Sequence, residues 1–412
     1  MLSVNDTEAV ILNLVHPLNV HGDTENVDLL AAAGRILATP VTSKLDFPHW
    51  DNSAMDGYAV RYEDVQHCSA EQPAVLEIVE EIPAGYQPQS TIQQGQAARI
   101  FTGAVMPSGA DTVVMQEMIS RQNNQVHILT APKSQEFVRH KAAFYQAGRQ
   151  LLPAGIILNP AEIAVLAAAQ CSPVSVYRRP RVAIFSTGDE LITIDQPLAA
   201  GQIVDSNSYA LAALVRQTGA EALMLGIVKD DPVVLEQTIA YAIANADLVI
   251  SSGGVSVGDY DYVDQILESL GAEIHIRAVA MRPGKPLTVA SFSTHNSALY
   301  FGLPGNPAAV LVTFLRFAQP TIKKLSGLSE GWEVKFVKVR SHQELRSDGK
   351  RETYVWGQLQ LINGVYEFRK AGGSHSSGNL INLAQTNALA VIPVGKTLIS
   401  PGEEVQVLPT LL

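Results

Sequence analysis

The pattern of apolar positions divides the chain into a helical start, a β-rich stretch and a stretch where strands and helices alternate. Residues 3–19 and 26–38 carry apolar side chains at helical spacing, which predicts two helices. Residues 46–142 carry short β-rich runs separated by Pro and Gly, which predicts a β-rich domain. Its predicted strands are Ala74–Ile82, Ala98–Phe101, Thr112–Met115 and Val126–Leu129.

From residue 181 to about residue 325, short apolar runs alternate with helical patterns. The predicted strands are residues 181–185, 222–228, 247–251, 274–280 and 298–301. The predicted helices are residues 206–219, 232–245, 260–270 and 306–318. This alternation predicts right-handed βαβ units and a doubly wound α/β sheet. A further helix is predicted to start at Asn159, with Pro160 at its first position and Glu162 as a reciprocal cap.

After Gly327 the pattern returns to short β runs. The predicted strands are residues 332–340, 353–362, 365–370, 388–392 and 404–408. Runs of this length and spacing are typical of a small β-barrel or sandwich. The fold class predicted for the whole chain is therefore multidomain, with a central doubly wound α/β domain and separate β domains.

Length and composition limit the classes of protein that this chain can represent. With 412 residues the chain exceeds one ordinary core, so about two to four domains are expected. Its net charge of −11 argues against a broad nucleic-acid interface. Two cysteines cannot form a structural zinc site by themselves. The longest apolar stretch, residues 151–171, is interrupted by Pro153, Pro160 and Glu162, so no membrane span is predicted. Without a basic region before an apolar one, the N-terminus predicts no signal peptide, and we expect a cytoplasmic protein.

The most informative stretch is Asp247–Asp261, an apolar run followed by a glycine-rich turn and a predicted helix. A strand, a glycine turn and a helix bring backbone N–H groups close to a phosphate or another oxyanion. Asp259 and Asp261 follow the glycines, where a metal bound to such oxygens needs ligands. A plain βα turn is the alternative interpretation. No Lys follows in the Walker position, which excludes a P-loop.

Polar residues also follow other predicted strands. Thr187–Glu190 come after the first of them, and carboxylates at the carboxyl end of a parallel sheet suit a metal or substrate site. Asp205 precedes a helix, where capping and ligand binding are equally plausible. Asp231 and Pro232 fit a helix start, which leaves Asp230 without a structural duty and makes it a metal or substrate candidate.

Two rigid loops complete the candidate chemistry. Residues 282–286 place Arg282 and Lys285 around a proline-flanked turn, as a phosphate contact requires. Residues 302–307 follow a predicted strand at the same sheet edge, and Pro304 and Pro307 rigidify that loop. Solvated surface loops are the alternative in both cases.

Seven sequence motifs follow one another over almost the whole chain: Asp51–Val60, Thr102–Ala104, Met115–Glu117, Phe185–Leu191, Ser251–Tyr262, Pro283–Pro286 and Gly302–Pro307. Taken together, these motifs resemble those of the molybdopterin molybdenumtransferases, the MoeA family, which includes the E domain of gephyrin.

The resemblance implies four domains and a homodimer whose active cleft lies between the α/β domain of one subunit and the β-rich domain of the other. Residues 1–45 and 143–177 would form a discontinuous, elongated helical domain, and residues 46–142 an inserted β-rich domain. Residues 178–326 would form the α/β molybdopterin-binding domain, and residues 327–412 a C-terminal β-barrel.

The activity implied is molybdenum insertion. Adenylated molybdopterin and molybdate would bind together, Mg²⁺ would assist cleavage of the phosphoanhydride, and AMP would leave. The implied protein partners are the molybdopterin adenylyltransferase and acceptor molybdoenzymes, with no nucleic acid and no membrane.

Matching motifs assign site residues to this chain. The catalytic positions would be Asp56, Thr102, Glu190, Asp230 and Asp261. Three of these, Glu190, Asp230 and Asp261, would hold the metal. The substrate-binding positions would be Ser186, Gly188, Asp205, Gly253, Gly254, Ser256, Arg282, Lys285, Pro304, Pro307, Arg351 and Ser374.

The chain departs from the family pattern at one functional position. Where the family normally carries Arg-Arg-x-Gly-Glu-Asp, this chain has Arg139-His-Lys-Ala-Ala-Phe144, and Phe144 can neither bind a metal nor accept a proton. Arg282 also replaces the usual Lys, and Ala308 a common Ser. One alternative is therefore a catalytically impaired member that carries the pterin or acts as a scaffold. Another is the related adenylyltransferase, against which the long N-terminal half and the barrel argue.

Overall fold

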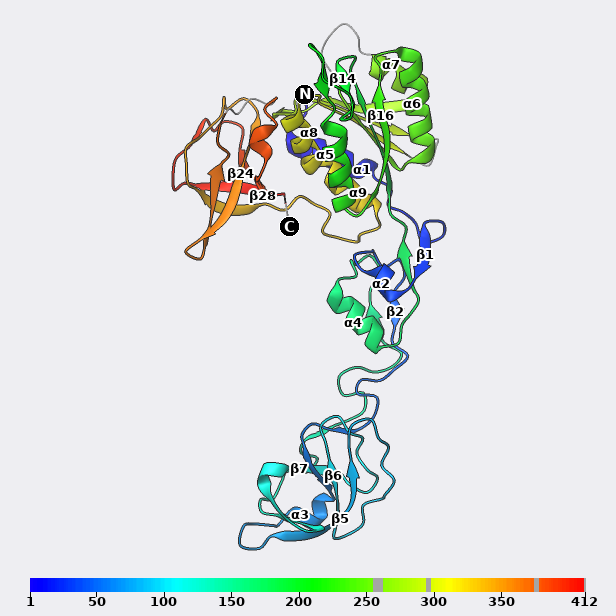
Figure 1. Ribbon diagram of the computed structural model, residues 1–412, viewed down its shortest axis with the longest axis vertical. Helices are drawn as coiled ribbons and strands as arrows, with labels where there is room; N and C mark the ends of the chain where they lie inside the picture. Colours follow the sequence, from blue (N-terminus) through cyan, green and yellow to red (C-terminus); the bar gives the residue numbers. More distant parts are fainter. Residues whose placement is uncertain (255–261, 294–297, 374–377, 411–412) are drawn as a thin grey trace. The chain divides into compact units, whose positions relative to one another are not determined.

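The computed structural model describes residues 1–254, 262–293, 298–373 and 378–410 (Figure 1). The chain divides into two compact units. Unit 1 comprises residues 1–39, 154–163 and 172–412, and unit 2 comprises residues 40–153 and 164–171. The four domain boundaries expected from the sequence remain a prediction.

The centre of unit 1 is a mixed six-stranded sheet with the strand order β16-β13-β17-β21-β20-β18. Its strands are β13 (Arg181–Thr187), β16 (Glu221–Val228), β17 (Leu248–Ser252), β18 (Ala272–Ala278), β20 (Pro286–Phe292) and β21 (Leu299–Leu303). The first four strands of this order run parallel. Parallel strands buried on both sides explain the nearly continuous apolar runs in β13 and β17.

Helices cover both faces of this sheet (Figure 1). In β13, Val182 and Ile184 pack with helices α1, α5, α8 and α9, whereas Ala183 and Phe185 pack with α6 and α7. Alternate residues of one strand thus serve two cores, which confirms the doubly wound α/β class. The helices are α1 (Val4–Leu14), α5 (Asn207–Gln217), α6 (Pro232–Asn245), α7 (Tyr262–Ser269), α8 (Pro307–Thr313) and α9 (Gln319–Leu325).

The sequence prediction was incomplete at the far edge of this sheet. It missed β20, which lies between β21 and β18 and runs antiparallel to both. The strand begins at Pro286, after a proline-rich loop, and a proline in an apolar run weakens a strand prediction, although both partner strands are near it in the chain. The predicted helix over 306–318 is also longer in the structure, because α8 continues through a π-helical turn, Phe314–Ala318, into α9.

Near the N-terminus the helix predictions were only partly correct. The first helix ends at Leu14 and not at residue 19. The second predicted helix is mostly wrong: strand β1 (Thr24–Val27) pairs with β12 (Val174–Tyr177), and α2 (Leu29–Ala32) is one turn long. Strand pairing with a segment about 150 residues away overrides the local helical spacing.

The C-terminal part of unit 1 is a closed β-barrel, as predicted. Strands β24, β25, β22, β28 and β26 pair in that order, and β26 pairs back to β24. The strands are β22 (Val337–Ser341), β24 (Glu352–Ile362), β25 (Val365–Lys370), β26 (Ala388–Ile392) and β28 (Glu404–Pro409), with β23 (Leu345–Arg346), β27 (Leu398–Ile399) and the 3₁₀ turn Ile381–Leu383 beside them. Strand β19 (Met281–Arg282) pairs with β24 and joins the barrel to the α/β part.

Unit 2 is built on a six-stranded sheet with the order β7-β4-β6-β5-β9-β8. Its strands are β4 (Gly57–Val60), β5 (Ala74–Ile82), β6 (Gln96–Ile100), β7 (Thr112–Met115), β8 (Ile119–Gln122) and β9 (Gln125–Ile128). Small cores lie on both faces. The β-rich prediction is confirmed, and β5 and β7 have the predicted bounds.

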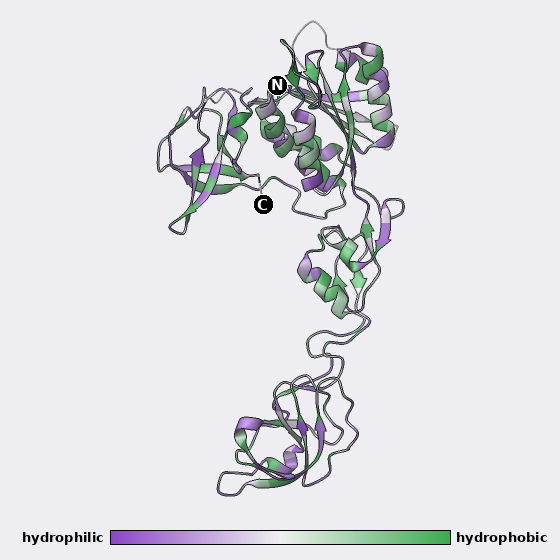
Figure 2. Cartoon of the chain, in the orientation of Figure 1, coloured by the Kyte–Doolittle hydropathy of each residue, from purple (hydrophilic) through white to green (hydrophobic). Residues whose placement is uncertain are grey.

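Short elements complete the chain. They are the helix α3 (Tyr62–Val65), the 3₁₀ turn Gln116–Met118, and the two-stranded pairs β2 (Val41–Thr42) with β11 (Gln150–Leu152), β3 (Asn52–Ser53) with β10 (Val138–Arg139), and β14 (Leu191–Ile192) with β15 (Ile203–Val204). Helix α4 (Pro160–Ala168) starts as predicted, and the Glu162 carboxylate accepts the Asn159 N–H at 3.0 Å. Its ribbon is hydrophobic over most of its length (Figure 2). Among the described residues, no helix has the length and apolar character needed to cross a membrane.

Candidate active site

The carboxyl ends of β13 and β17 lie side by side, because the two strands are parallel neighbours. Gly253 and Gly254 follow β17, with φ angles of 92° and 68° in the left-handed region. A Cβ at Gly253 would lie 2.3 Å from the Thr187 carbonyl oxygen, so only glycine fits there. The predicted glycines therefore let this turn pack directly on the end of β13. The continuation of the turn, with Ser256 and Asp261, lies outside the described residues.

Ser186 and Asp205 form a buried hydrogen-bonded pair at the end of β13. The Ser186 hydroxyl donates to Asp205 Oδ1 at 3.0 Å, and the Ser208 N–H donates to the same oxygen at 3.1 Å. Asp205 thereby caps α5 and ties it to the sheet edge, so the capping interpretation left open by the sequence is present in the structure. A role for either residue in substrate binding remains a prediction.

Asn207 joins three loops of the same edge and was not among the predicted site residues. Its Nδ2 donates to Ser252 Oγ and to the Gly305 carbonyl, both at 2.8 Å. The bond to Gly305 fixes the loop that carries Pro304 and Pro307. The only sequence signal was the position of Asn207 beside a helix start.

Three carboxylates come from the loops after β13 and β16. Asp231 caps α6 as predicted, accepting the N–H groups of Val233 at 2.9 Å and Val234 at 3.0 Å. Asp230 has no such duty, and its carboxylate accepts the Thr187 hydroxyl. Glu190 is exposed, and its carboxylate reaches so close to Gly188 that a Cβ there would lie 2.7 Å from an oxygen.

These side chains offer the oxygen ligands that Mg²⁺ prefers. Within the described ranges, no three His, Cys, Asp or Glu side chains group closely enough to hold a metal ion. One of the three predicted ligands, Asp261, lies outside those ranges. The metal assignment to Glu190, Asp230 and Asp261 therefore remains a prediction.

The basic residues of the site are positioned by a carboxylate that the sequence prediction missed. Asp348 contacts Arg282 at 3.3 Å and Arg351 at 3.9 Å. The Lys350 backbone N–H, followed by the charges of Arg282 and Arg351, holds the pKa of Asp348 below its ordinary value. Asp348 belongs to the C-terminal barrel region and Arg282 to the α/β region, so no local motif links them.

One cavity of unit 1, with a volume of about 1890 Å³, brings most of the predicted positions together. Its lining includes Gly188, Glu190, Asp205, Asp230, Gly253, Gly254, Arg282, Lys285, Pro304, Pro307 and Arg351. Ser186 is not part of the lining among the described residues. Ser374 lies outside those residues. The cavity thus combines a glycine turn, carboxylates and cations, as a site for an anionic ligand requires.

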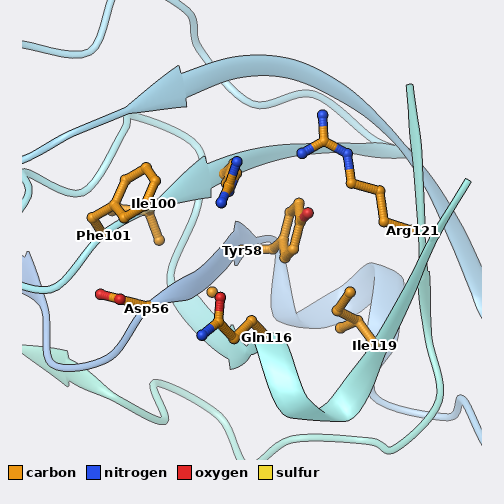
Figure 3. A pocket seen from close by; sticks show the side chains of 9 residues that line it. Asp56, Tyr58, Ile100, Phe101, Gln116, Ile119 and Arg121 are labelled. Atoms are coloured by element: carbon orange, nitrogen blue, oxygen red, sulfur yellow. The ribbon is translucent and has the colours of Figure 1, made fainter. Parts of the chain in front are cut away.

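The two remaining predicted positions, Asp56 and Thr102, form a hydrogen-bonded pair in unit 2. Asp56 Oδ1 accepts both the backbone N–H and the hydroxyl of Thr102 at 2.7 Å. These two bonds, with a smaller effect from the charge of Arg99, hold the pKa of Asp56 below its ordinary value. The carboxylate therefore stays ionised at one end of a small pocket beside β4 and β6 (Figure 3).

Residues 139–144, which depart from the family pattern, are held in unit 2 by contacts with Asp51. The Lys141 N–H donates to Asp51 at 2.7 Å, and His140 lies 3.1 Å from the same carboxylate. Phe144 is 71% exposed. Ala142 has a φ of 63°, a left-handed conformation that costs free energy for any residue with a Cβ.

Replacing Ala142 with glycine should therefore stabilise unit 2 by about 0.5–1 kcal/mol, because the φ angle is already one that glycine adopts freely. Thermal unfolding of the full chain measures the effect. Ala143→Gly is the matched control and should destabilise slightly, since Ala143 is not among the positive-φ residues. Equal loss of stability in both variants would contradict this assignment of strain.

Three regions of the chain match known protein families, and together they define the class of protein. Residues 2–169 match "MoeA N-terminal region (domain I and II)", residues 183–324 match "Probable molybdopterin binding domain", and residues 338–410 match "MoeA C-terminal region (domain IV)". These three regions cover most of the chain, in the order that the resemblance implied.

Relatives of full length specify the family. The chain is 73% identical to a molybdopterin molybdenumtransferase of Nostoc sp. (strain PCC 7120), covering 99% of this chain and 94% of the relative. It is 33% identical to the protein of that name from Haemophilus influenzae, over 94% of each chain. The crystal structure of a molybdopterin biosynthesis MoeA protein from Pyrococcus horikoshii OT3 matches with a TM-score of 0.84 at 27% identity, covering 99% of this chain and 100% of that one. The chain belongs to the MoeA family of molybdopterin molybdenumtransferases.

Proposed function

We propose that this protein transfers molybdenum from molybdate to adenylated molybdopterin and releases AMP. The observation that carries the proposal is the unit 1 cavity, which brings together a glycine turn, carboxylates and five basic side chains. Its volume of about 1890 Å³ can accommodate a dinucleotide-sized ligand together with a small oxyanion. The relatives with the transferase name match over nearly their full length, which disfavours the adenylyltransferase alternative.

The proposed roles follow from the chemistry of each group. Backbone N–H groups of the turn at Gly253 would bind phosphate oxygens. Arg282 and Arg351, which both contact Asp348, would neutralise anionic charge on the substrates. Asp348 would keep the two guanidinium groups in place. Glu190 and Asp230 would hold Mg²⁺ together with Asp261, and the ion would supply charge stabilisation at the phosphoanhydride.

A homodimer is part of the proposal, and helix α4 supports it. Of this largely apolar helix only Leu166 is buried within the chain, while Val165 and all four alanines are exposed (Figure 2). An exposed apolar helix is a surface that a second copy of the chain would cover. The proposed location is the cytoplasm, and the adenylyltransferase and acceptor molybdoenzymes are the proposed partners.

The test is AMP release from adenylated molybdopterin by the purified protein, with molybdate and Mg²⁺. We expect AMP release that depends on molybdate and that activates a cofactor-free molybdoenzyme in the same mixture. Tight pterin binding with neither signal would contradict the proposal and favour a carrier or scaffold that lacks the carboxylate replaced by Phe144.

A further inference from the structure

A small pocket of about 230 Å³ in unit 2 is lined by a tyrosine whose hydroxyl has no hydrogen-bond partner among the described residues (Figure 3). Its lining comes from β4, β6, the turn after β7, and β8. Tyr58 is only 3% exposed, because its ring packs in the core beside Val60 and Val114. Its hydroxyl makes no hydrogen bond to any described residue and is accessible from the pocket, so it can donate to a bound ligand.

Two guanidinium groups line the same pocket. Arg99 gives one nitrogen to Glu81 at 3.2 Å and lies 4.9 Å from the centre of the Phe101 ring, which fixes its plane. Arg121 uses only Nε, for the Asn123 carbonyl at 3.4 Å. Each guanidinium carries five N–H donors, so several stay available.

Charge is separated along the pocket. Figure 3 shows the Tyr58 hydroxyl directed towards the end where Arg121 lies, with Asp56 at the other end. Both hydrogen bonds to the Asp56 carboxylate come from Thr102, so the carboxylate does not neutralise the arginines by direct contact. One end therefore carries the positive charge of Arg121 and the other the negative charge of Asp56.

We propose that Tyr58, Arg99 and Arg121 form a subsite for a tetrahedral oxyanion, such as a phosphate monoester or molybdate. A hydroxyl and two guanidinium groups match the acceptor oxygens of such an ion. The pocket is too small for a whole nucleotide, so the subsite binds one oxyanion and the first atoms attached to it. The choice of probes rests on the proposed function, but the subsite itself does not.

The test measures anion binding by calorimetry in the full-length protein. Arg282→Gln and Arg351→Gln are introduced first, to weaken anion binding in the unit 1 cavity. The probes are inorganic phosphate, AMP and molybdate, each titrated separately. In this background, Arg121→Gln should weaken binding about tenfold or more, and Tyr58→Phe about fivefold. Tyr58→Phe keeps the buried ring and removes only the hydroxyl.

Arg61→Gln is the matched control, because Arg61 lies in the same unit, pairs with Glu63 at 2.7 Å, and does not line the pocket. It removes the same charge and should leave binding unchanged. Loss of affinity for phosphate and AMP alone would identify a phosphate subsite, and loss for molybdate alone a molybdate subsite.

The proposal is overturned if the background protein binds none of the probes, if the two pocket variants bind like the background, or if Arg61→Gln weakens binding equally. Thermal unfolding verifies that each variant is folded. AMP release by the unmodified protein is measured separately, so a failure of the insertase proposal and a failure of the subsite can be told apart.

Discussion

Replacing Glu190 with glutamine should lower the rate of AMP release about 100-fold or more. The change keeps the shape of the side chain and removes the charge with which it would position a cation or a reacting group. The exposed Glu190 lines the cavity beside Gly188 and comes from the turn held by the pairing of β14 and β15. Such an exposed side chain contributes little to stability, so the fold should be unaffected.

Three measurements separate this result from a structural effect. AMP release gives the rate, Mn²⁺ titration followed by electron paramagnetic resonance gives metal affinity, and thermal unfolding gives stability. Glu221→Gln is the matched control, because Glu221 begins β16, at the end of the strand away from the site. A Glu190→Gln protein that turns over and binds Mn²⁺ normally would refute the assignment.

Replacing Glu8 with alanine should destabilise unit 1 by about 3–5 kcal/mol, because it leaves the buried charge of Arg316 uncompensated. Glu8 lies on α1 and makes two bonds to Arg316, at 2.6 and 2.8 Å. The Arg316 side chain is only 3% exposed, also donates to the Tyr354 hydroxyl at 3.1 Å, and lies 5.6 Å from the Phe336 ring. One guanidinium thus joins α1, the π-helical turn and the barrel strand β24.

Urea unfolding followed by circular dichroism measures this loss. Glu63→Ala is the control, since it breaks the more exposed Arg61–Glu63 pair and should cost less than about 1 kcal/mol. The double variant Glu8→Met, Arg316→Met should be more stable than Glu8→Ala, because it removes the buried charge together with its partner. A cost for Glu8→Ala no larger than that of Glu63→Ala would disprove the buried-charge argument.

Local patterns predicted the elements whose character is set by their own residues. The alternation in β5 and β7 and the Asp231–Pro232 start of α6 fixed those bounds correctly, since side-chain periodicity and capping act within a few residues. The same reasoning failed for residues 26–38, where pairing between β1 and β12 decided the conformation.

In the site, too, local patterns predicted some residues and only the tertiary structure identified the partners of others. The glycines after β17 were recognisable as a close-approach turn, although only the structure identifies the Thr187 carbonyl as what they approach. Asp205 was recognised as either a cap or a ligand, and the structure shows its capping bond from the Ser208 N–H. No sequence signal indicated the contact of Asp348 with Arg282, because 66 positions separate them, whereas its other partner, Arg351, is only three residues away.

The sequence by itself determined the family, the doubly wound core and the barrel, because motif order, hydrophobic period and turn residues are properties of short segments. The tertiary structure alone decided how Glu8 meets Arg316 across 308 positions and how Tyr58 comes to face Arg121 in one pocket. These contacts depend on which distant segments pack together. The free energy of that packing is a property of the whole fold, so no short segment contains it.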